Sequence, residues 1–203
     1  MTNPSVPAPE DLRSWRKAER ARLIGAREAL DAARRAADTA AIARDLDALL
    51  ADAAQALVSV YWPIRAEPDL REWMRARCER GGRVALPVAV ALRQPMQFRE
   101  WRPGAPLARG LWQIPIPADG PEVTPDVVIA PLVGYDPAGF RLGYGGGFFD
   151  RTLAQLIGRG ARPRVIGVGY ESQALATIHP QPHDIPMDWI VTGTAAPRRR
   201  AAA

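Results

Sequence analysis

The residues with the clearest chemical potential in this chain are four glycines between Arg141 and Arg151. A backbone with few side chains can turn several successive N–H groups toward one anion, and the start of a following helix adds partial positive charge. The flanking arginines can supply the charge that a lysine supplies in other phosphate-binding loops. The glycines at 143, 145, 146 and 147 therefore predict a phosphate cradle, although a turn that only lets the chain double back has the same composition.

The spacing of this segment excludes two familiar phosphate-binding motifs. No Lys-Ser or Lys-Thr pair follows the glycines, as a Walker loop requires, and Phe148 stands where the third glycine of a dinucleotide fingerprint would fall. Asp150 closes the segment, and a carboxylate next to bound phosphate needs a cation between them, which favours Mg²⁺. The helix dipole alone also favours an aspartate in a first helical turn, so both interpretations of Asp150 stay open.

Other potential metal ligands and nucleophiles give weaker signals. His179 and His183 have the spacing of a helical zinc pair, but Pro180 and Pro182 preclude a regular helix between them. We therefore expect no zinc site there, and expect His183 and the adjacent Asp184 to help close a nucleotide site instead. No Ser-His-Asp or Cys-His pattern points to nucleophilic catalysis.

Helices and strands of recognisable pattern must position these residues. Residues 11–57 are rich in helix formers and nearly free of glycine and proline, which predicts two helices with a joint near Ala37 and a cap at Asp38 or Thr39. Short apolar runs predict strands, and apolar residues at helical spacing predict two further helices. The expected strands are 57–61, 83–90, 96–101, 127–133, 165–170 and 189–192, and the further helices are 68–80 and 148–157.

Strands that alternate with helices predict an α/β fold. We expect a three-layer, mostly parallel sheet with helices on both faces, preceded by the N-terminal helical pair. Ligands bind such sheets at the carboxyl ends of the strands, and the glycine segment follows the clearest strand, 127–133. We expect a single domain over 1–203, with an ordered core of about 10–195 and a disordered tail at 196–203.

Composition restricts the class of partner. The 203 residues carry a formal charge of +5, and all but one of the 27 lysines and arginines are arginine, the exception being Lys17. Genomic base composition can explain that bias, but a basic surface also suits nucleic acid or a small anion such as a nucleotide. The arginines are scattered, which disfavours nucleic acid. The lone Cys78, and the lack of an apolar span or leader, predict a cytoplasmic protein without membrane contact.

Several segments together resemble the 5-formyltetrahydrofolate cyclo-ligase family. The most specific is 131–151, PLVGYDPAGFRLGYGGGFFDR, and weaker agreement in order and spacing extends over 61–69, 110–117, 166–173 and 183–192. The resemblance implies ATP- and Mg²⁺-dependent closure of 5-formyltetrahydrofolate to 5,10-methenyltetrahydrofolate, with release of ADP and phosphate. It implies small-molecule partners, namely ATP and a reduced folate with or without a polyglutamate tail, and a monomer or weak homodimer. The alternative is a divergent paralogue that acts on another formylated or carboxylated metabolite.

The resemblance also implies a role for each candidate site residue. The family pairs two basic residues one helical turn apart at the triphosphate, which here are Arg16 or Lys17 with Arg20, although Glu19 stands where the family has an apolar residue. Glu67 matches a folate-contacting glutamate, whose carboxylate can accept hydrogen bonds from the pterin. The other assignments are ATP binding by Gly143, Tyr144, Gly145, Gly146, Gly147, Phe148, Phe149 and Asp150, folate binding by Met96, Trp112, Tyr144 and Phe148, metal binding by Asp150 and Asp184, and catalysis by Arg141 and Arg151.

This chain departs from the family pattern at two places in or beside the glycines. Family members usually have one or two tyrosines where Phe148 and Phe149 stand, so a hydroxyl that would contact substrate or phosphate is missing. Animal members have basic side chains at the positions of Tyr144 and Gly146, whereas bacterial members resemble this chain. The first departure bears on catalytic efficiency and on the paralogue alternative.

Overall fold

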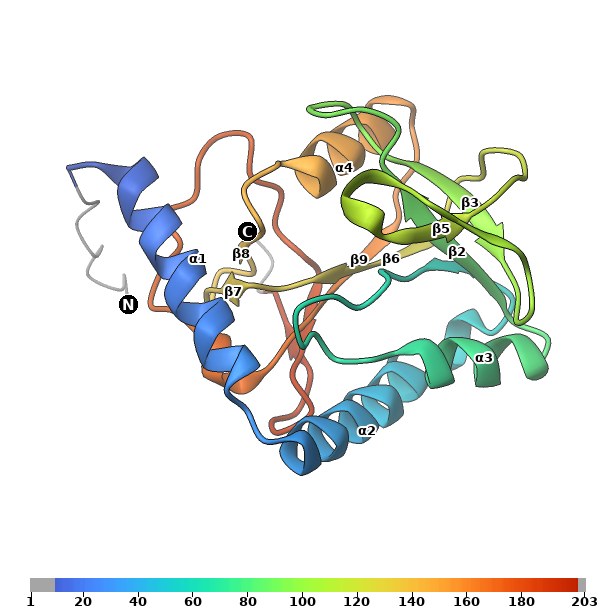
Figure 1. Cartoon of the computed structure of the whole chain (residues 1–203), viewed down its shortest axis with the longest axis horizontal. Helices are drawn as coiled ribbons and strands as arrows, with labels where there is room; N and C mark the ends of the chain where they lie inside the picture. The colour runs from blue at the N-terminus through green and yellow to red at the C-terminus, as the bar shows by residue number, and fades with distance from the viewer. Residues whose placement is uncertain (1–9, 201–203) are drawn as a thin grey trace.

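A seven-stranded sheet forms the centre of the computed structural model, which describes residues 10–200 (Figure 1). The strand order is β11-β10-β9-β6-β1-β2-β3, and pairing is parallel except where β3 and β11 form the two edges. The sheet is therefore mostly parallel, as the sequence predicts. Its strands are β1 (Leu57–Ser59), β2 (Arg83–Val88), β3 (Gln97–Trp101), β6 (Val127–Pro131), β9 (Arg164–Val168), β10 (Trp189–Val191) and β11 (Arg198–Arg199).

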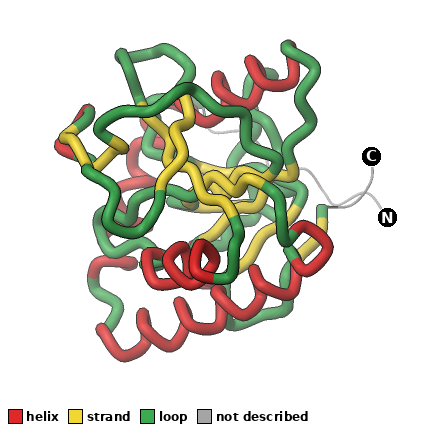
Figure 2. The backbone as a smooth tube through the Cα atoms, turned by 90° about the vertical axis from the view of Figure 1, so that its right-hand side faces the viewer, coloured by secondary structure: helices red, strands yellow, loops and turns green. Residues whose placement is uncertain are grey.

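Helices cover both faces of this sheet, which confirms the predicted three-layer α/β fold. On one face lie α2 (Ala32–Leu49) and α3 (Arg71–Glu79), and Leu46 of α2 is fully buried against the strands. On the other face lies α4 (Phe148–Gly158), with Leu153 buried in a second core. Figure 1 shows α2 and α3 below the sheet and α4 above it, and Figure 2 shows the strands enclosed between helices. Because the sheet is covered on both sides, all five residues of β6 are buried.

The first helix, α1 (Leu12–Glu28), packs at the carboxyl end of the central strands. Its residue Leu23 is buried in a small core with Val133, which follows β6 directly. The same core includes the end of a short hairpin formed by β7 (Gly134–Tyr135) and β8 (Arg141–Leu142). This packing places one face of α1 beside the segment that carries the glycines (Figure 1).

A second hairpin lies in the proline-rich segment between β3 and β6, where the sequence pattern predicts no strand. It consists of β4 (Leu107–Arg109) and β5 (Pro115–Pro117), joined by the short 3-10 helix η2 (Leu111–Gln113). The hairpin lies beside β2 and β3 (Figure 1). Because proline has a low strand propensity, the prolines at both ends of β5 argue against a strand at this position in the sequence.

The predicted joint between the first two helices is wrong. The chain breaks at 29–31, where the side chain of Asp31 accepts hydrogen bonds from the N–H groups of Ala33 and Arg34 and so caps α2. Asp38, which we expect at the cap, lies inside α2 and pairs with Arg34 at 2.9 Å. Without glycine or proline in this stretch, several aspartates are equally plausible caps, and the apolar face that begins at Ile42 masks the earlier start of the helix.

The prediction of a disordered tail is wrong for Arg198 and Arg199. These residues form β11, which pairs with β10 in antiparallel register. Arg198 also donates hydrogen bonds to the hydroxyl of Tyr135 and to the carboxylate of Glu171. Partners distant in sequence hold this strand, so local composition cannot reveal it. The last part of the predicted tail, 201–203, lies outside the described residues, within which no helix is long and apolar enough to span a membrane.

Candidate functional site

A cavity of about 1120 Å³ opens at the carboxyl end of the central parallel strands. Tyr61, Pro87 and Pro131, which end or follow three neighbouring strands, form part of its wall. Open α/β sheets bind ligands at this edge. Typical small-molecule pockets measure roughly 300–1,000 Å³, so this cavity is at the large end of the range for a ligand site. Its other walls come from α1, the hairpin of β4 and β5, the segment 182–185 and the glycines.

The glycine loop (residues 143–147) joins β8 to α4 along one wall of the cavity. Gly145 has a φ of +95° and Gly147 a φ of +62°, conformations that other residues rarely adopt. A Cβ on Gly145 would lie 3.3 Å from the guanidinium carbon of Arg20, and one on Gly147 would lie 3.0 Å from Nη1 of Arg151. The loop therefore requires glycine both for its backbone angles and for the close approach of two arginines.

The hydrogen bonds of the glycine loop use several of its carbonyl groups and leave N–H groups available. Arg20 Nε donates to the carbonyl oxygen of Gly143 at 2.7 Å, and Arg151 Nη2 donates to that of Gly146. Among residues 10–200, no acceptor pairs with the N–H groups of residues 145–147. Free N–H groups ahead of a helix N-terminus, with guanidinium groups beside them, suit an anion such as phosphate.

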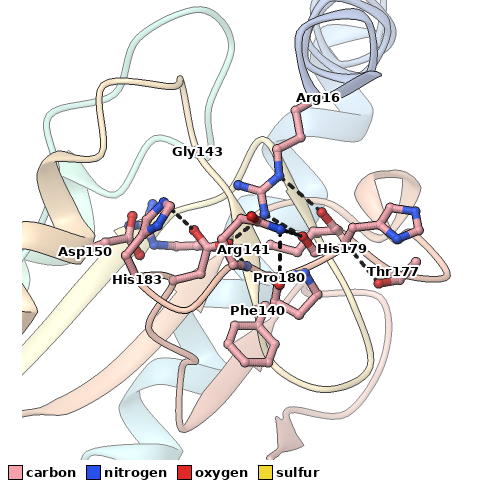
Figure 3. A network of polar contacts seen from close by, with 12 residues as sticks. Arg16, Phe140, Arg141, Gly143, Asp150, Thr177, His179, Pro180 and His183 are labelled. Atoms are coloured by element: carbon pink, nitrogen blue, oxygen red, sulfur yellow. Dashed lines mark hydrogen bonds and ion pairs between the residues drawn. The ribbon is translucent and has the colours of Figure 1, made fainter. Parts of the chain in front are cut away.

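Two aspartates line the same cavity, each paired with an arginine. Figure 3 shows Asp150 and the two arginines, Arg16 and Arg141. Arg141 Nη2 lies 2.9 Å from Asp150 Oδ2, and Arg16 Nη2 lies 2.6 Å from Asp184 Oδ2. Burial lowers the pKa of Arg141, while the charges of Asp150 and Asp184 raise it. Because a guanidinium starts from a pKa far above neutrality, Arg141 remains charged near both carboxylates.

These carboxylates suit Mg²⁺ only when another ligand supplies further oxygens. Mg²⁺ usually binds one or two carboxylates together with substrate phosphates and waters. Within the described range, no group of three His, Cys, Asp or Glu side chains converges on one point. Asp150 and Asp184 retain 16% and 9% of their side-chain exposure on the cavity wall. The donor set therefore fits a magnesium–nucleotide complex and does not fit an isolated metal centre.

Arg16 and Arg20 form the basic pair that α1 presents to the cavity. Arg16 also donates hydrogen bonds to the carbonyl oxygens of Ile178 and His179, at 3.3 and 2.8 Å (Figure 3). These bonds connect α1 to the loop that contains Ile178 and His179. Burial and the nearby charge of Arg16 lower the pKa of Arg20. Lys17 is exposed and does not line the cavity, so of the two alternatives for the first basic position it is Arg16 that faces the cavity. One step along a helix turns a side chain by about 100°, which carries Lys17 off this face.

Aromatic and apolar side chains line a further part of the cavity. Trp112 of η2 is 62% exposed, and its ring meets that of Phe148 edge to face with 5.3 Å between centroids. Trp112 adopts a φ of +54°, a strained angle that turns the hairpin back on itself. Met96 is buried, and its N–H donates to the hydroxyl of Thr152 at 2.8 Å, which fixes it against α4.

Glu67 is the buried carboxylate of this part of the cavity. Its Oε2 accepts the N–H of Ile64 at 2.9 Å, and its Oε1 accepts the hydroxyl of Tyr144 at 2.7 Å. Burial raises the pKa of Glu67, while these two hydrogen bonds and the charge of Arg27 lower it. The net effect is a pKa above the ordinary value for glutamate, so its ionised form depends on the donors around it.

The cavity brings together almost all of the predicted site residues. Those that line it are Arg16, Arg20, Glu67, Met96, Trp112, Arg141, Asp150, Arg151, Asp184, the glycine loop with Tyr144, and Phe148 with Phe149, and His183 lies there as expected. Sequence reasoning missed Tyr61, the hairpin residues Leu111 and Ile114, and the supporting residue Arg27. Arg27 follows Arg20 by seven residues, which is two helical turns, and that spacing is the signal that could have found it.

Comparison with protein families gives one match that covers most of the chain. The model of the 5-formyltetrahydrofolate cyclo-ligase family matches residues 12–193. A 5-formyltetrahydrofolate cyclo-ligase of Mycolicibacterium smegmatis is 35% identical over 143 residues, which cover 66% of this chain and 72% of that protein. A protein of the same name from Escherichia coli K12 is 32% identical over 141 residues, which cover 66% of this chain and 76% of that protein.

Solved structures show the same fold. The NMR structure of 5,10-methenyltetrahydrofolate synthetase from Aquifex aeolicus aligns with a TM-score of 0.79 and 24% identity, and covers 93% of this chain and 94% of that one. A 5,10-methenyltetrahydrofolate synthetase from Mycoplasma pneumoniae aligns with a TM-score of 0.71 and 22% identity, and covers 88% of this chain and 98% of that one. At these identities the likeness establishes the fold, including the N-terminal helical pair.

Proposed function

The chain belongs to the 5-formyltetrahydrofolate cyclo-ligase family, and on that basis we propose that it converts 5-formyltetrahydrofolate to 5,10-methenyltetrahydrofolate with ATP and Mg²⁺. One observation carries the proposal within this chain. The glycine loop, with its free N–H groups, and the buried carboxylate of Glu67 open into the same cavity of about 1120 Å³. An anion site and a site for N–H donors thus lie within one compartment, as a reaction between a nucleotide and a pterin requires.

The chemistry of the reaction explains why positioning dominates the site. The formyl oxygen of the substrate is a poor leaving group, so it takes the γ-phosphoryl group of ATP and ADP departs. N10 of the same folate then attacks the activated carbon, the C–O bond breaks, and phosphate leaves. Both reacting atoms of the second step belong to one molecule, so the protein gains rate by orienting the substrate and by neutralising charge. No nucleophile of the protein is needed.

The positive groups of the site serve the triphosphate. The N–H groups of the glycine loop would bind phosphate oxygens, and Arg16, Arg20 and Arg151 would neutralise their charge. Arg141 would hold Asp150 in place through their contact at 2.9 Å and face the charge that develops during transfer. Asp150 would hold Mg²⁺, which would supply charge neutralisation to the phosphates. Asp184 is the second carboxylate available to it.

The folate would occupy the part of the cavity with the buried glutamate. Glu67 would accept hydrogen bonds from the amino and ring N–H groups of the pterin. Met96, Trp112 and Phe148 offer apolar and aromatic surface for its rings. Because Trp112 is largely exposed at the hairpin, it would lose water when a ring packs against it and so exclude solvent from the reacting atoms.

The test is the formation of 5,10-methenyltetrahydrofolate, followed by its absorbance, from 5-formyltetrahydrofolate and Mg-ATP. We expect product with the unchanged protein, and a loss of about 10³-fold or more in kcat/KM with Asp150→Ala, the scale of a lost electrostatic group in phosphoryl transfer. Asp119→Ala, a change at an exposed aspartate that does not line the cavity, is the matched control. If no product forms at high enzyme concentration, or if another metabolite stimulates ATP hydrolysis and the folate does not, the assignment fails.

The remaining parts of the proposal concern the cell. A single cysteine, Cys78, suits a reducing compartment, and we place the reaction in the cytoplasm. The proposed partners are ATP and a reduced folate, because the arginines that line the cavity account for the local positive charge without nucleic acid.

A further inference from the structure

Tyr144 ties the glycine loop to the opposite side of the site. Its hydroxyl donates to Glu67 Oε1 at 2.7 Å and accepts from Arg27 Nη2 at 2.6 Å. The other four residues of the glycine loop have no side chain, so this phenol is the one side-chain tether that the loop itself provides. One residue of the anion-binding loop is therefore bonded directly to the carboxylate of the folate site.

Arg27 is the buried side chain that holds this tyrosine in place. Its side chain is fully buried, and its Nε and Nη1 donate to the carbonyl oxygens of Arg65 and Leu132, at 2.9 and 3.1 Å. The remaining donor, Nη2, points at Tyr144, and Glu67 Oε1 lies 4.0 Å from Nη1 as the counter-charge. Each of the three nitrogens of Arg27 donates a hydrogen bond within the protein, and the residue does not line the cavity, so Arg27 supports the site without contacting a ligand there.

The two hydrogen bonds that Glu67 accepts orient its carboxylate and leave acceptor positions free for the N–H donors of a ligand. An ionised carboxylate has about four acceptor positions, two on each oxygen. The N–H of Ile64 uses one position on Oε2, and the hydroxyl of Tyr144 uses one on Oε1. One position therefore remains on each oxygen, which is what a planar pair of N–H donors from a pterin needs. Burial raises the pKa of Tyr144 well above its usual value, so the phenol remains a donor.

The backbone around Glu67 depends on the same anchor. Arg65 and Ala66 adopt backbone φ angles of +47° and +58°, which residues other than glycine rarely adopt. Arg27 helps to stabilise this backbone conformation, because it donates a hydrogen bond to the carbonyl oxygen of Arg65. Glu28 of the same helix pairs with the Arg65 guanidinium at 2.8 Å. The last turn of α1 thus sets both the strained backbone that presents Glu67 and the phenol that contacts it.

We propose that Tyr144, anchored by Arg27, is a positioning residue that couples the two substrates: a nucleotide held by the glycine loop fixes the Tyr144 hydroxyl on Glu67, and thereby prepares that carboxylate for the pterin. This inference rests on the proposed function, because it takes ATP and a pterin as the ligands. The coupling is positive, since each ligand stabilises the same contact between Tyr144 and Glu67, and so favours the arrangement that the other ligand binds.

The experiment measures 5-formyltetrahydrofolate binding by calorimetry, with and without a non-hydrolysable ATP analogue and Mg²⁺. We expect the analogue to tighten folate binding by about five- to tenfold in the unchanged protein, within the usual range of such couplings. In Tyr144→Phe, which retains the ring, the effect of the analogue falls below about twofold. Tyr170→Phe is the matched control, because Tyr170 is buried away from the cavity and its change leaves the coupling intact.

A double-mutant cycle shows whether Tyr144 acts through Glu67. In a Glu67→Gln background, which we expect to weaken folate binding, adding Tyr144→Phe has little further effect on the folate Kd. Circular dichroism verifies that each variant is folded, and Tyr144→Phe alone still tests the coupling if Glu67→Gln destabilises the buried Arg27. Additive effects in the cycle, or unchanged coupling in Tyr144→Phe, would overturn the inference. So would tighter folate binding in Tyr144→Phe, since the hydroxyl would then be a competitor.

A failure of this inference differs from a failure of the proposed function. If the unchanged protein binds neither the folate nor the nucleotide, both are overturned. If it binds both and forms 5,10-methenyltetrahydrofolate, while the analogue leaves the folate Kd unaltered, only the coupling role of Tyr144 is overturned.

Discussion

Comparing Gly145→Ala with Gly81→Ala separates the backbone requirement of the glycine loop from its role in binding nucleotide. Gly145 has a φ of +95°, and a Cβ there would lie 3.3, 3.4 and 3.6 Å from three guanidinium atoms of Arg20. Arg20 donates to the carbonyl of Gly143 at 2.7 Å, so the added methyl group presses on the contact that holds the loop closed. Gly145→Ala therefore changes two things at once, the free energy of the backbone and the position of one guanidinium.

The size of each effect can be worked out separately. A left-handed backbone angle costs an L residue about 1–2 kcal/mol, which lowers Tm by roughly 2–8 °C in a chain of this size. Contacts of 3.3–3.4 Å require Arg20 to give way by a few tenths of an ångström. A displaced Arg20 would lose a hydrogen bond to the triphosphate. A hydrogen bond from a charged group is worth about 1.5–3 kcal/mol, and a loss of about 1.5 kcal/mol raises KM for ATP by about tenfold.

Gly81→Ala is the matched control for this prediction. Gly81 has a φ of +84° but nothing within 4 Å of the added Cβ, and it lies outside the cavity. Thermal unfolding followed by circular dichroism, with steady-state kinetics at varied ATP, compares the two variants. Both should lose similar stability, and only Gly145→Ala should raise KM for ATP. An equal rise in both variants, or an unchanged KM in Gly145→Ala, would refute the account of the loop.

Three further predictions follow from the site and the core. Arg16→Ala should raise KM for ATP about tenfold, through loss of a charge-assisted contact, while Lys17→Ala leaves kinetics unchanged; equal effects would contradict the observed register of α1. Phe149→Tyr restores a hydroxyl on a ring that lies 5.0 Å from the Arg141 guanidinium, and it should raise kcat by about fivefold, the worth of one hydrogen bond of about 1 kcal/mol. An unaltered kcat in the absorbance assay would show that the missing hydroxyl is irrelevant. Burial raises the pKa of Tyr135 to about 12, above the unfolded value of about 10, so its contribution to stability is complete below about pH 10 and is lost as the pH rises to about 12. Urea unfolding across this range, with tyrosinate absorbance as the second signal, should show the loss, and a constant free energy of unfolding would contradict it.

The sequence predicts the elements of this fold well where burial sets a clear pattern. The run 127–133 is apolar throughout because β6 is covered on both faces, and the strand lies within that run. The N-terminal helices are likewise evident from composition. Their joint is not, because Asp31 and Asp38 are both plausible caps and only packing decides between them. The sequence pattern does not predict strand β11, which short local composition cannot distinguish from a tail, or the hairpin of β4 and β5, whose prolines disfavour a strand.

The candidate site is foreseeable where the chain itself brings residues together. The glycine loop and Asp150 lie within eight positions of each other, and the loop needs glycine for reasons that are visible in the sequence. Arg16 and Arg20 are assigned less securely, because the residue types alone leave the register of α1 open. Arg27 shows the limit most clearly. Its spacing of seven residues from Arg20 places the two on one face of α1, but only the fold brings Arg27 to Tyr144 and Glu67.

We propose that one cavity binds a nucleotide and a reduced folate so that the nucleotide activates the folate. A single-turnover experiment tests this, with enzyme in excess over 5-formyltetrahydrofolate and Mg-ATP added to start the reaction. Rapid quenching measures ADP and 5,10-methenyltetrahydrofolate in the same samples. ADP and 5,10-methenyltetrahydrofolate should accumulate in equal amounts, and neither should form when one of the two substrates is omitted. ADP formed at the same rate without the folate, or cyclised product formed without ATP, would contradict this proposal.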